Sequence, residues 1–429
     1  MKNSYVNIML LCFSLITLKA RSQDRQRCAT DEHLLFIIKQ NPSLAYTMKK
    51  NEVSFENWIA SHIGERSNGT IATIPVIVHV IYNTSNENIS DAQVQSQIKV
   101  FNQDFERLNP DTIMTRPIFK SVVANCHIQF CLAKQDPNGF LTNGIVHIKT
   151  NVTAFGTLDS MKFTSCGGDD AWPDSEYLNI WVCNMANEYL GYAQYPGGPD
   201  ATDGIVTDYT AFGDTDNVEE PYNKGRTSTH EVGHWLNLYH PFNNGCVGTT
   251  LSTCDTSGDY CCDTPPEAEP WYGCLSGAPT MNTCGGSNMP DMIENFMDYT
   301  EDSCMNIFTQ DQSARMTATL NTIRKSILTS KGCITGIESG IEQNSFDMAL
   351  SVFPNPTNSN FTVRVAQPKY TNVTIQVFNL FGQLISSSLI NDNKQLETSF
   401  KISDSPAGDY IIKISSNSDF VVKKIVLIK

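Results

Sequence analysis

The sequence predicts an α+β fold followed by a small all-β domain, and three patterns lead to this prediction. Apolar, strand-like runs such as 74–82 and 178–183 alternate with helical patterns, which is typical of a sheet layered with helices. Residues 239–304 lose this periodicity and are dominated by Cys, Gly, Pro, Asp and Asn, which indicates an irregular, disulfide-rich region. After about residue 349, apolar and polar residues alternate along short segments, as in a β-sandwich.

Local signals define the elements in order. Residues 23–66 carry helical patterns and end in the polar stretch 64–69, which a protease could reach. A buried strand is expected at 74–82, and Ser90 is expected to cap the next helix. The apolar face of that helix consists of Val94, Ile98, Phe101 and Phe105. Further strands are expected at 128–132, 145–148, 178–183, 361–365, 373–377, 410–414 and 420–428, and a further helix at 309–329.

The composition excludes two classes of protein. The chain has 429 residues, which is enough for two or three domains of about 150 residues each. Hydrophobic residues make up 40% and charged residues 17% of the chain, a globular mixture that argues against wholesale disorder. The net charge is −15 and no Lys/Arg-rich run occurs, so we do not expect a nucleic-acid-binding protein.

The N-terminus has the pattern of an export signal at 1–22. Lys2 supplies a positive start, residues 5–18 form an apolar core, and the small residues Ala20 and Ser22 suit cleavage nearby. An N-terminal membrane anchor is the alternative, but the apolar run is shorter than the roughly 20 residues that span a bilayer. No later segment of the sequence has the length and apolarity to span a membrane, so a secreted or cell-surface protein is expected.

The cysteine content agrees with export, because disulfides persist in oxidising compartments. The chain has 14 cysteines, and loss of Cys12 with the signal peptide leaves an odd number, which predicts one unpaired thiol. A structural zinc site is the alternative for Cys254, Cys261, Cys262, Cys274 and Cys284, although no CxxC motif occurs.

Residues 230–240 read HEVGHWLNLYH and predict a catalytic metal site. His230 and His234 are four residues apart, so on a helix they share one face and can bind one Zn²⁺. His240 offers a third ligand, which leaves a fourth position open, as in catalytic rather than structural zinc sites. Glu231 lies beside the metal on the same helix and can act as a general base.

Glu231 and the histidines outside the motif also have structural interpretations. Glu231 also fits a capping box that begins at Ser228, which would serve only to start the helix. His79, His127 and His147 lie in or beside apolar strands, and we expect them to be structural rather than metal ligands.

The motif resembles the metzincin signature HExxHxxGxxH over its whole length, with Asn237 in place of the glycine. That glycine lets the chain leave the helix through a left-handed conformation, and Asn is the next most tolerant residue there. The segment NFMDY at 295–299 resembles the methionine turn of metzincins, with Met297 as the apolar floor beneath the metal. The resemblance implies a twisted sheet with an active-site helix above an irregular lower subdomain.

Longer segments are similar to the pappalysin family, particularly to its small ulilysin-like members. These segments are THEVGHWL, GDYCCDTPPE, NFMDYTEDSCM and FTQDQSARM, and the resemblance spans about residues 28–335. It implies that His230, His234 and His240 bind zinc and that Glu231 is the general base.

The resemblance also implies two residues that act on the substrate. The hydroxyl of Tyr299 would support the tetrahedral intermediate, a reasonable role for a donor aimed at a developing oxyanion. The carboxylate of Asp302 would lie at the floor of the pocket for the side chain that follows the scissile bond, and would favour Arg or Lys there. The structural alternatives are a packed tyrosine for Tyr299 and a solvated acid for Asp302.

Residues 258–264 resemble the family's calcium loop. Asp259 and Thr264 would donate side-chain oxygens and Cys262 a backbone carbonyl, a set of oxygen ligands that suits Ca²⁺. An insertion around Cys254 departs from the short family members and leaves the ligand set open. The family pairing joins Cys246 to Cys284 and Cys274 to Cys304.

Cys28 lies in the segment RCATDEH, which resembles the family's pro-segment. A thiolate there could occupy the open zinc position and exclude water, so the precursor would be latent. Arg66 and Ser67 resemble the family's maturation site. Removal of residues up to Arg66 would take Cys28 away and leave an even number of cysteines, compatible with six disulfides. An ordinary unpaired cysteine is the alternative for Cys28.

Three C-terminal segments resemble the sorting domain of type IX bacterial secretion. They are VFPNPT at 352–357, FNLFGQ at 378–383 and PAGDY at 406–410. The implied partner is the type IX secretion machinery, which carries its cargo across an outer membrane. A carbohydrate- or protein-binding module is the alternative.

The leading hypothesis is a secreted zinc endopeptidase that is made as a latent precursor and acts on protein or peptide substrates. Its expected parts are a signal peptide at 1–22, a pro-segment at 23–66, a metzincin-like peptidase domain at 67–336, a linker at 337–348 and a β-sandwich sorting domain at 349–429. Zinc is the expected catalytic cofactor and Ca²⁺ a structural one. An extended substrate is expected to pair with an edge strand near 204–209.

Two alternatives come from other classes. A non-proteolytic surface adhesin could retain a zinc site, although it would be free to lose Glu231, which is present. A zinc hydrolase could instead act on a non-peptide amide. The natural substrate and the oligomeric state stay open at this point.

Overall fold

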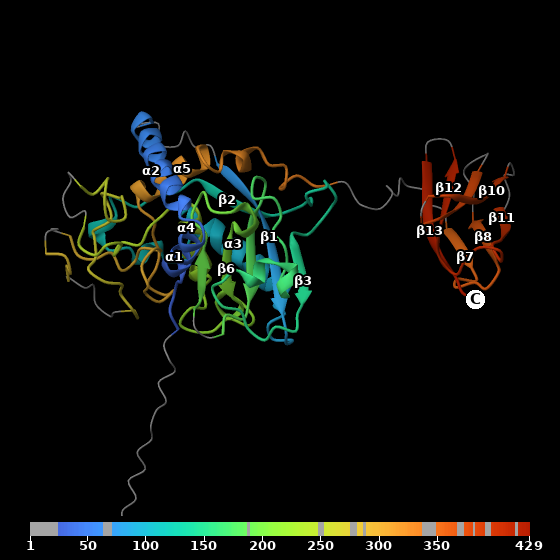
Figure 1. The fold of residues 1–429 in the computed structure, drawn as a ribbon, viewed down its shortest axis with the longest axis horizontal. Helices are drawn as coiled ribbons and strands as arrows, with labels where there is room; N and C mark the ends of the chain where they lie inside the picture. Colours follow the sequence, from blue (N-terminus) through green and yellow to red (C-terminus); the bar gives the residue numbers. More distant parts are fainter. Residues whose placement is uncertain are drawn as a thin grey trace, which may run out of the picture. The chain divides into compact units, whose positions relative to one another are not determined.

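Figure 1 shows the computed structural model, in which the chain forms two compact units, Met1–Thr335 and Gly336–Lys429. The structure describes residues 25–62, 71–186, 189–247, 253–274, 281–285, 289–336, 349–366, 373–380, 382–390, 396–416 and 419–429. The predicted signal peptide, the cleavage site at Arg66 and Ser67, and the linker at 337–348 lie outside the described residues.

The first unit contains a mixed six-stranded sheet with β1 (Ala72–Tyr82) near its centre. One side of β1 is parallel to β4 (Leu178–Cys183). Its other side is parallel to β2 (Ile128–Leu132) along the first half and to β3 (Ile145–Lys149) along the second half. Most side chains of β1 are buried, which explains its continuous apolar run, because parallel strands are normally covered on both faces.

Two further strands complete this sheet. β6 (Ile205–Asp208) is parallel to β4, and β5 (Gly191–Ala193) is antiparallel to β6 and ends the row. The expectation of an edge strand at 204–209 is therefore wrong, because β6 has a neighbour on each side and β5 is the edge strand. β5 has only 3 residues, too few for a periodic signal in the sequence.

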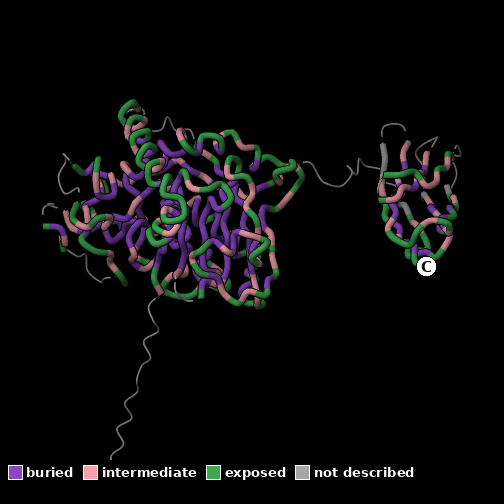
Figure 2. The backbone as a smooth tube through the Cα atoms, in the orientation of Figure 1, coloured by how far each residue is buried: buried purple, intermediate pink, exposed green. Residues whose placement is uncertain are grey.

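Helix α3 (Asp91–Phe105) begins where the sequence predicts it. The hydroxyl of its N-cap, Ser90, accepts a hydrogen bond from the backbone N–H of Gln93 at 3.0 Å. The predicted apolar face packs against β2 and joins the main core. Figure 2 shows this core as the buried segments around the sheet.

Helix α4 (Arg226–Trp235) packs against β5 and β6 and carries the predicted metal motif. The helix expected at 309–329 is shorter than predicted: α5 (Gln310–Asn321) ends early, and the 3₁₀ helix η7 (Lys325–Thr329) follows it. The chain leaves the helical conformation at Thr322, whose hydroxyl donates to the carbonyl of Ala318 at 2.6 Å.

Residues 30–61 form two helices, as the sequence predicts. They are α1 (Thr30–Gln40) and α2 (Ser43–Ser61), which Figure 1 shows in blue. α1 contacts β5 and α2 contacts α5, so this segment covers the part of the unit that holds α4 and α5. Ile37, Leu44 and Phe55 are its buried apolar side chains.

The remaining helices are short 3₁₀ turns in the connections of the first unit. They are η1 (Pro110–Met114), η2 (Pro117–Phe119), η3 (Ser160–Lys162), η4 (Thr164–Cys166), η5 (Asp200–Thr202) and η6 (Tyr209–Ala211). Among the helices of the described residues, none combines the length and apolar character needed to cross a bilayer.

Disulfides hold the irregular region together. The bonds are Cys131–Cys333, Cys246–Cys284, Cys254–Cys262 and Cys274–Cys304. The second and the fourth are the two pairs that the family resemblance implies. A structural zinc site made of the cysteines at 254–284 is excluded, because all of them except Cys261 are disulfide-bonded.

The expectation of one unpaired thiol and six disulfides is wrong. Five cysteines have no disulfide partner within the described residues: Cys28, Cys126, Cys166, Cys183 and Cys261. Cys126 and Cys183 are enclosed in apolar clusters, where they pack as small hydrophobic residues. The even number of cysteines left after residue 66 therefore did not predict how many form disulfides, because free cysteines are common in protein cores.

The second unit is a β-sandwich, as the sequence predicts. One antiparallel sheet has the order β10 (Leu384–Ile390), β9 (Val373–Asn379), β12 (Gly408–Ser416) and β13 (Asp419–Leu427). The other has the order β11 (Leu396–Lys401), β8 (Asn360–Ala366) and β7 (Ala349–Phe353). Alternate residues of these strands, among them Phe361, Ile375 and Ile412, form a separate core.

The contact between α4 and the methionine turn predicts a stability change. A Cβ atom added at Gly233 would lie 2.4 Å from the sulfur of Met297, which is fully buried. We expect Gly233→Ala to lower the free energy of unfolding by about 1–3 kcal/mol through overpacking, measured by thermal or urea unfolding. Gly156→Ala is the matched control, because a Cβ there meets no described atom within 4 Å. Equal stability of the two variants would contradict this packing.

Candidate metal centre and the segment that covers it

The interior of α4 carries His230, Glu231 and His234, all with 0% exposure. The helix begins after Gly225, whose φ of 72° suits glycine. Glu231 therefore lies well inside the helix, and the capping-box alternative that begins at Ser228 is wrong. The two histidines lie one turn apart on one face, as their spacing predicts.

Asn237 turns the chain out of α4 so that His240 returns to the helix. Its φ is 71°, the left-handed conformation expected for the residue that replaces the motif glycine. Its carbonyl accepts hydrogen bonds from the guanidinium of Arg315 at 3.2 and 3.3 Å. The turn is thus held from α5, and this compensates for the cost of a non-glycine residue at positive φ.

The three histidines meet at their Nε2 atoms. The distances are 3.0 Å between His230 and His234, 2.9 Å between His234 and His240, and 3.2 Å between His230 and His240. A tetrahedral Zn²⁺ with Zn–N bonds of about 2.0–2.1 Å places its nitrogen ligands roughly 3.3 Å apart. The spacing is therefore close to that of a zinc site.

The opposite nitrogen of each ring is held by an acceptor. His230 Nδ1 lies 2.8 Å from the Phe296 carbonyl, and His234 Nδ1 lies 2.7 Å from the Leu238 carbonyl. His240 Nδ1 lies 3.2 Å from a carboxylate oxygen of Asp31. These acceptors place the proton on Nδ1 and leave three Nε2 lone pairs facing one another, an arrangement that a cation stabilises.

Burial keeps the rings of His230 and His234 neutral. Burial and the neighbouring histidines lower the pKa of His230 well below its usual value, and the same causes lower the pKa of His234 to about 3. Neutral imidazole is the form that binds metal ions. The donor set therefore fits Zn²⁺ in chemistry as well as in spacing.

Met297 packs against α4 at Gly233. It is fully buried, and its sulfur occupies the space that a side chain at Gly233 would need. The sequence analysis did not single out Gly233, although the glycine inside HEVGH is the signal that points to this close contact.

The three histidines that were predicted to be structural, His79, His127 and His147, do not belong to this centre. His79 is buried and bonded through Nδ1 to Asp169 at 2.7 Å, and His147 Nε2 lies 2.9 Å from Asp91. Among the described residues, the group that could hold a metal ion is Cys28 with His230, His234 and His240, whose ligand atoms all lie within 4.8 Å of one another.

Cys28 faces the histidines and also contacts Glu231. Its thiol donates a hydrogen bond to Glu231 Oε2 at 3.4 Å, and the hydroxyl of Thr30 donates to the same oxygen at 2.9 Å. Burial raises the pKa of Glu231 to about 8, and a bound dication would lower it again. Residues 25–62, here called the covering segment, thus engage one oxygen of the glutamate through Cys28 and Thr30.

Residues 26–29 pair with the chain at Tyr189–Gly191, at the start of β5 and on its outer edge. The amide of Ala29 donates to the Gly191 carbonyl, and the amide of Leu190 donates to the Gln26 carbonyl, both at 2.9 Å. Gln26 pairs with Tyr189 in the parallel sense. This segment therefore occupies the edge to which an extended peptide could add as a strand.

Arg27 forms a buried ion pair with Asp302. Its Nη2 lies 3.0 Å from Asp302 Oδ1, and both side chains have 0% exposure. Asp302 Oδ2 accepts from the amides of Lys224 and Arg226 at 2.9 and 3.1 Å, which fixes the carboxylate. The alternative of a solvated acid is therefore wrong. The sequence analysis missed Arg27, although a basic residue next to the predicted switch cysteine was the available signal.

Tyr299 lies beside the same segment. Its hydroxyl donates to the carbonyl of Cys28 at 3.4 Å, and its ring centroid is 5.0 Å from that of His240. The hydroxyl thus already contacts a peptide carbonyl next to the histidines.

The helices of the covering segment add two contacts. Glu52 of α2 forms a bidentate pair with Arg315 at 2.6 and 3.1 Å. His33 of α1 lies 2.8 Å from Asp159, and both are buried. Because Arg315 also holds Asn237, the covering segment is linked to the turn that positions His240.

The predicted calcium residues lie together in one loop. Asp259 and Thr264 are buried, and Asp259 Oδ2 has no hydrogen-bond partner among the described residues. Burial raises the pKa of Asp259 well above its usual value, and the neighbouring Asp263 adds to this. Cys262 lies in the same loop and is disulfide-bonded to Cys254. A cation would compensate for the buried carboxylate of Asp259.

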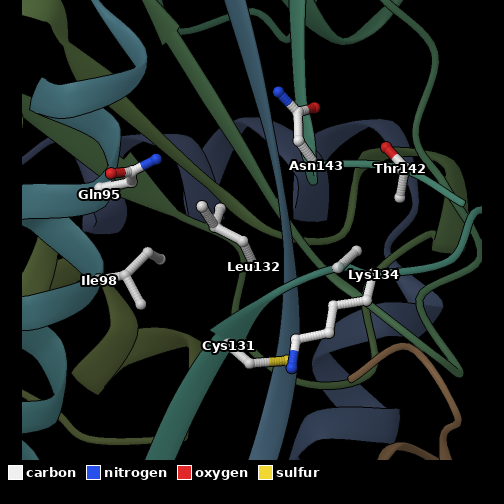
Figure 3. Close-up of a pocket in the computed structure, with 8 residues that line it drawn as sticks. Gln95, Ile98, Cys131, Leu132, Lys134, Thr142 and Asn143 are labelled. Atoms are coloured by element: carbon white, nitrogen blue, oxygen red, sulfur yellow. The ribbon is translucent and has the colours of Figure 1, made fainter. Parts of the chain in front are cut away.

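A surface hollow of about 320 Å³ lies between α3 and the segment after β2 (Figure 3). It is lined by Gln95, Ile98, Cys131, Leu132, Ala133, Lys134, Thr142 and Asn143. None of these is a predicted site residue, so the hollow is separate from the metal centre. At that centre, residues 27–30 fill the space, and Arg27 and Cys28 are at most 2% exposed.

Comparisons with known proteins agree with this geometry. The model of the M43 peptidase family, described as pregnancy-associated plasma protein-A, matches residues 166–321. The model of a secretion system C-terminal sorting domain matches residues 351–429.

Curated relatives are named as extracellular proteases. The chain is 30% identical over 307 residues to an extracellular metalloprotease of Colletotrichum graminicola, with 69% of this chain and 90% of the relative covered. It is 38% identical over 145 residues to extracellular metalloprotease 1 of Coccidioides posadasii, covering 33% and 48%. The chain spans about half the length of the first curated relatives that it matches. The relatives and the sorting domain indicate a secreted or cell-surface protein.

Solved structures extend the similarity to the covering segment. Mature mirolysin of Tannerella forsythia, in complex with a cleaved peptide, is 44% identical with a TM-score of 0.56, covering 61% of this chain and 96% of that one. A promirolysin mutant of Tannerella forsythia is 39% identical with a TM-score of 0.61, covering 71% and 97%. Together with the metal centre, these matches show that the chain belongs to the pappalysin (M43) family of metzincin metalloproteases.

Proposed function

We propose that this protein is a secreted zinc endopeptidase, made as a latent precursor, that cleaves peptide bonds before Arg or Lys. The observation that carries the proposal is the convergence of His230, His234 and His240 beside Glu231, with Arg27 inserted against Asp302. The three histidines would hold Zn²⁺. When bound, zinc supplies a Lewis acid that polarises the carbonyl and makes water more acidic.

The chain's own residues would carry the proton and orient the substrate. Glu231 takes the proton from the attacking water and passes it to the leaving amine. The hydroxyl of Tyr299 donates a hydrogen bond to the developing oxyanion, close to where it meets the Cys28 carbonyl. The carboxylate of Asp302 binds the basic side chain on the leaving-group side, as it binds Arg27.

Residues 25–62 would keep the precursor inactive. The thiol of Cys28 lies among the metal-binding atoms, where it excludes water, and Thr30 engages the general base. Arg27, which is in the pocket, precedes Cys28, which is at the metal centre. In a substrate cut before a basic residue the order is opposite, because the residue with the scissile carbonyl precedes the pocket residue. The segment therefore runs backwards through the site and escapes cleavage there.

The proposal also covers maturation, calcium and secretion. Cleavage after Arg66 would release the pro-segment, and Ca²⁺ bound by Asp259, Thr264 and the Cys262 carbonyl would stabilise the irregular region. The sorting domain at 351–429 would direct the chain to the type IX secretion machinery.

The main test is the cleavage of a proteome-derived peptide mixture by the matured protein, with new peptide ends identified by mass spectrometry. We expect new N-termini that begin with Arg or Lys. Glu231→Gln is expected to lower the rate by roughly 10²–10⁴, because it removes general base catalysis. Asp302→Asn keeps an oxygen for the two backbone amides but loses the charge, which is expected to lower kcat/KM for Arg at least tenfold, or about 1.5–3 kcal/mol.

The outcomes separate the parts of this proposal. Cleavage that persists in Glu231→Gln would rule out the glutamate as general base. Cleavage without a basic preference would rule out the role of Asp302 alone. A matured protein that binds zinc and cleaves no peptide would contradict the peptidase function and favour a binding protein that retains a zinc site.

Latency gives a second prediction. Cys28→Ala removes the thiol from the metal centre, so we expect at least tenfold faster appearance of activity from the unprocessed precursor, measured with a fluorogenic peptide. Cys166→Ala is the matched control, because Cys166 is a free but exposed thiol. Unchanged latency in Cys28→Ala would show that Arg27 and the helices suffice without the thiol.

The calcium loop gives a third prediction. With zinc held constant, Ca²⁺ at 100 times its Kd is expected to stabilise the protein by about 2.7 kcal/mol, seen as a higher Tm. Asp259→Asn is expected to raise the Ca²⁺ concentration that gives half of the Tm increase at least tenfold, because it removes a buried charged ligand. Asp214→Asn, an exposed acid elsewhere, should leave the titration unchanged. A Tm that does not change with Ca²⁺ concentration would contradict the proposed calcium site.

A further inference from the structure

Two arginines of the pro-segment form ion pairs inside the first unit. Arg27 meets Asp302, and Arg25 has been given no role so far. Arg25 Nη2 lies 2.7 Å from Asp208 Oδ2, where the Asp208 side chain is 1% exposed and the Arg25 side chain 15%. Its Nη1 donates to the hydroxyl of Thr210 at 2.9 Å, and its Nη2 also donates to the Tyr189 carbonyl at 3.0 Å. Three acceptors thus surround one guanidinium.

These acceptors belong to the peptidase part and remain after the pro-segment has left. Asp208 ends β6 and is fixed by its own contacts: Oδ2 accepts from the amide of Met185 at 2.9 Å, and Oδ1 accepts from the amide of Thr210 at 3.0 Å. The carboxylate is therefore preformed and does not need Arg25 to orient it.

The surroundings of Asp208 are acidic as well. The pKa of Tyr209 is raised by burial, and then by the charges of Asp208, Glu219 and Glu87, while Arg25 lowers it. Loss of the pro-segment removes this cation, whereas the three acidic groups remain. A substrate cation would restore the balance of charge.

The position of this site follows from the order of residues in the pro-segment. Gln26 pairs with Tyr189 in the parallel sense, and the chain bends at Arg27 before Cys28 reaches the histidines. Arg27 meets Asp302, and Arg25, two residues earlier, meets Asp208. In residue order, the contact with Asp208 is therefore farther from Cys28 than the contact with Asp302.

We propose that Asp208, with Thr210 and the Tyr189 carbonyl, forms a second cation-binding subsite of the matured enzyme. It binds the side chain of the third substrate residue after the scissile bond and favours Arg there. This inference rests on the proposed peptidase function and extends it, because substrates would then carry two basic residues separated by one residue. Arg25 occupies the subsite in the precursor as Arg27 occupies the Asp302 pocket.

The test compares two peptides that share a basic residue after the scissile bond and carry Arg or Gln at the third position. For the matured protein, obtained by proteolytic removal of the pro-segment from the full chain, we expect kcat/KM to be about fivefold higher with Arg. The ratio should decline as ionic strength rises, because the pair is partly exposed.

Variants assign the effect to the subsite. Asp208→Asn should bring the ratio close to one while the preference for Arg directly after the scissile bond is retained. Asp91→Asn is the matched control, because Asp91 is a half-exposed acid paired with His147 elsewhere. Since Asp208 also bonds to backbone amides, the Tm of each variant is measured. Thr210→Val, which keeps the carboxylate but removes one acceptor, should lower the ratio in part.

Each result decides the question. Equal kcat/KM for the two peptides in the wild type would overturn the subsite while the peptidase function stands. A ratio that persists in folded Asp208→Asn would overturn the assignment to Asp208. Failure to cleave either peptide would overturn the proposed function, and the subsite with it.

Discussion

Three buried imidazoles whose Nε2 atoms lie within 3.2 Å of one another are the constraint around which the first unit is organised. Such an arrangement is unfavourable without a cation, so the fold has to hold the rings in place before any metal arrives. It does so from separate parts of the chain. The acceptors for Nδ1 are the carbonyls of Phe296 and Leu238 and the carboxylate of Asp31. The last of these belongs to the pro-segment, so the precursor itself contributes to the orientation of His240.

Residues 25–30 contact the candidate site at three points. Cys28 lies beside the three histidines, Arg27 against the carboxylate of Asp302, and the backbone of residues 26–29 beside the start of β5. Under the proposed function, inhibition and substrate binding would use the same contacts, and the reversed chain direction would separate one from the other. The pair of Glu52 with Arg315 links α2 to the turn at Asn237. Under the same proposal, loss of the pro-segment would leave Arg315 without that carboxylate.

Much of the fold was predictable because its signals are local. The strands around β1, the cap at Ser90, the two helices of the pro-segment and the alternating strands of the sandwich follow from periodicity over a few residues. Apart from the early end of α5, the main errors concern relations between distant segments. The edge strand is β5 rather than β6, and five cysteines are free where an even count suggested bridges. Neither strand order nor cysteine pairing is encoded in a short window.

The sequence by itself determined the chemistry of the centre, because residue types at the spacing of one helical turn already place two histidines and a glutamate on α4. Through family resemblance it also predicted the left-handed turn at Asn237 and a latency role for Cys28. Only the tertiary structure decided what Arg25, Arg27 and Thr30 contact. Their partners Asp208, Asp302 and Glu231 lie more than 180 residues away along the chain, and contacts over such distances arise from packing rather than from local pattern.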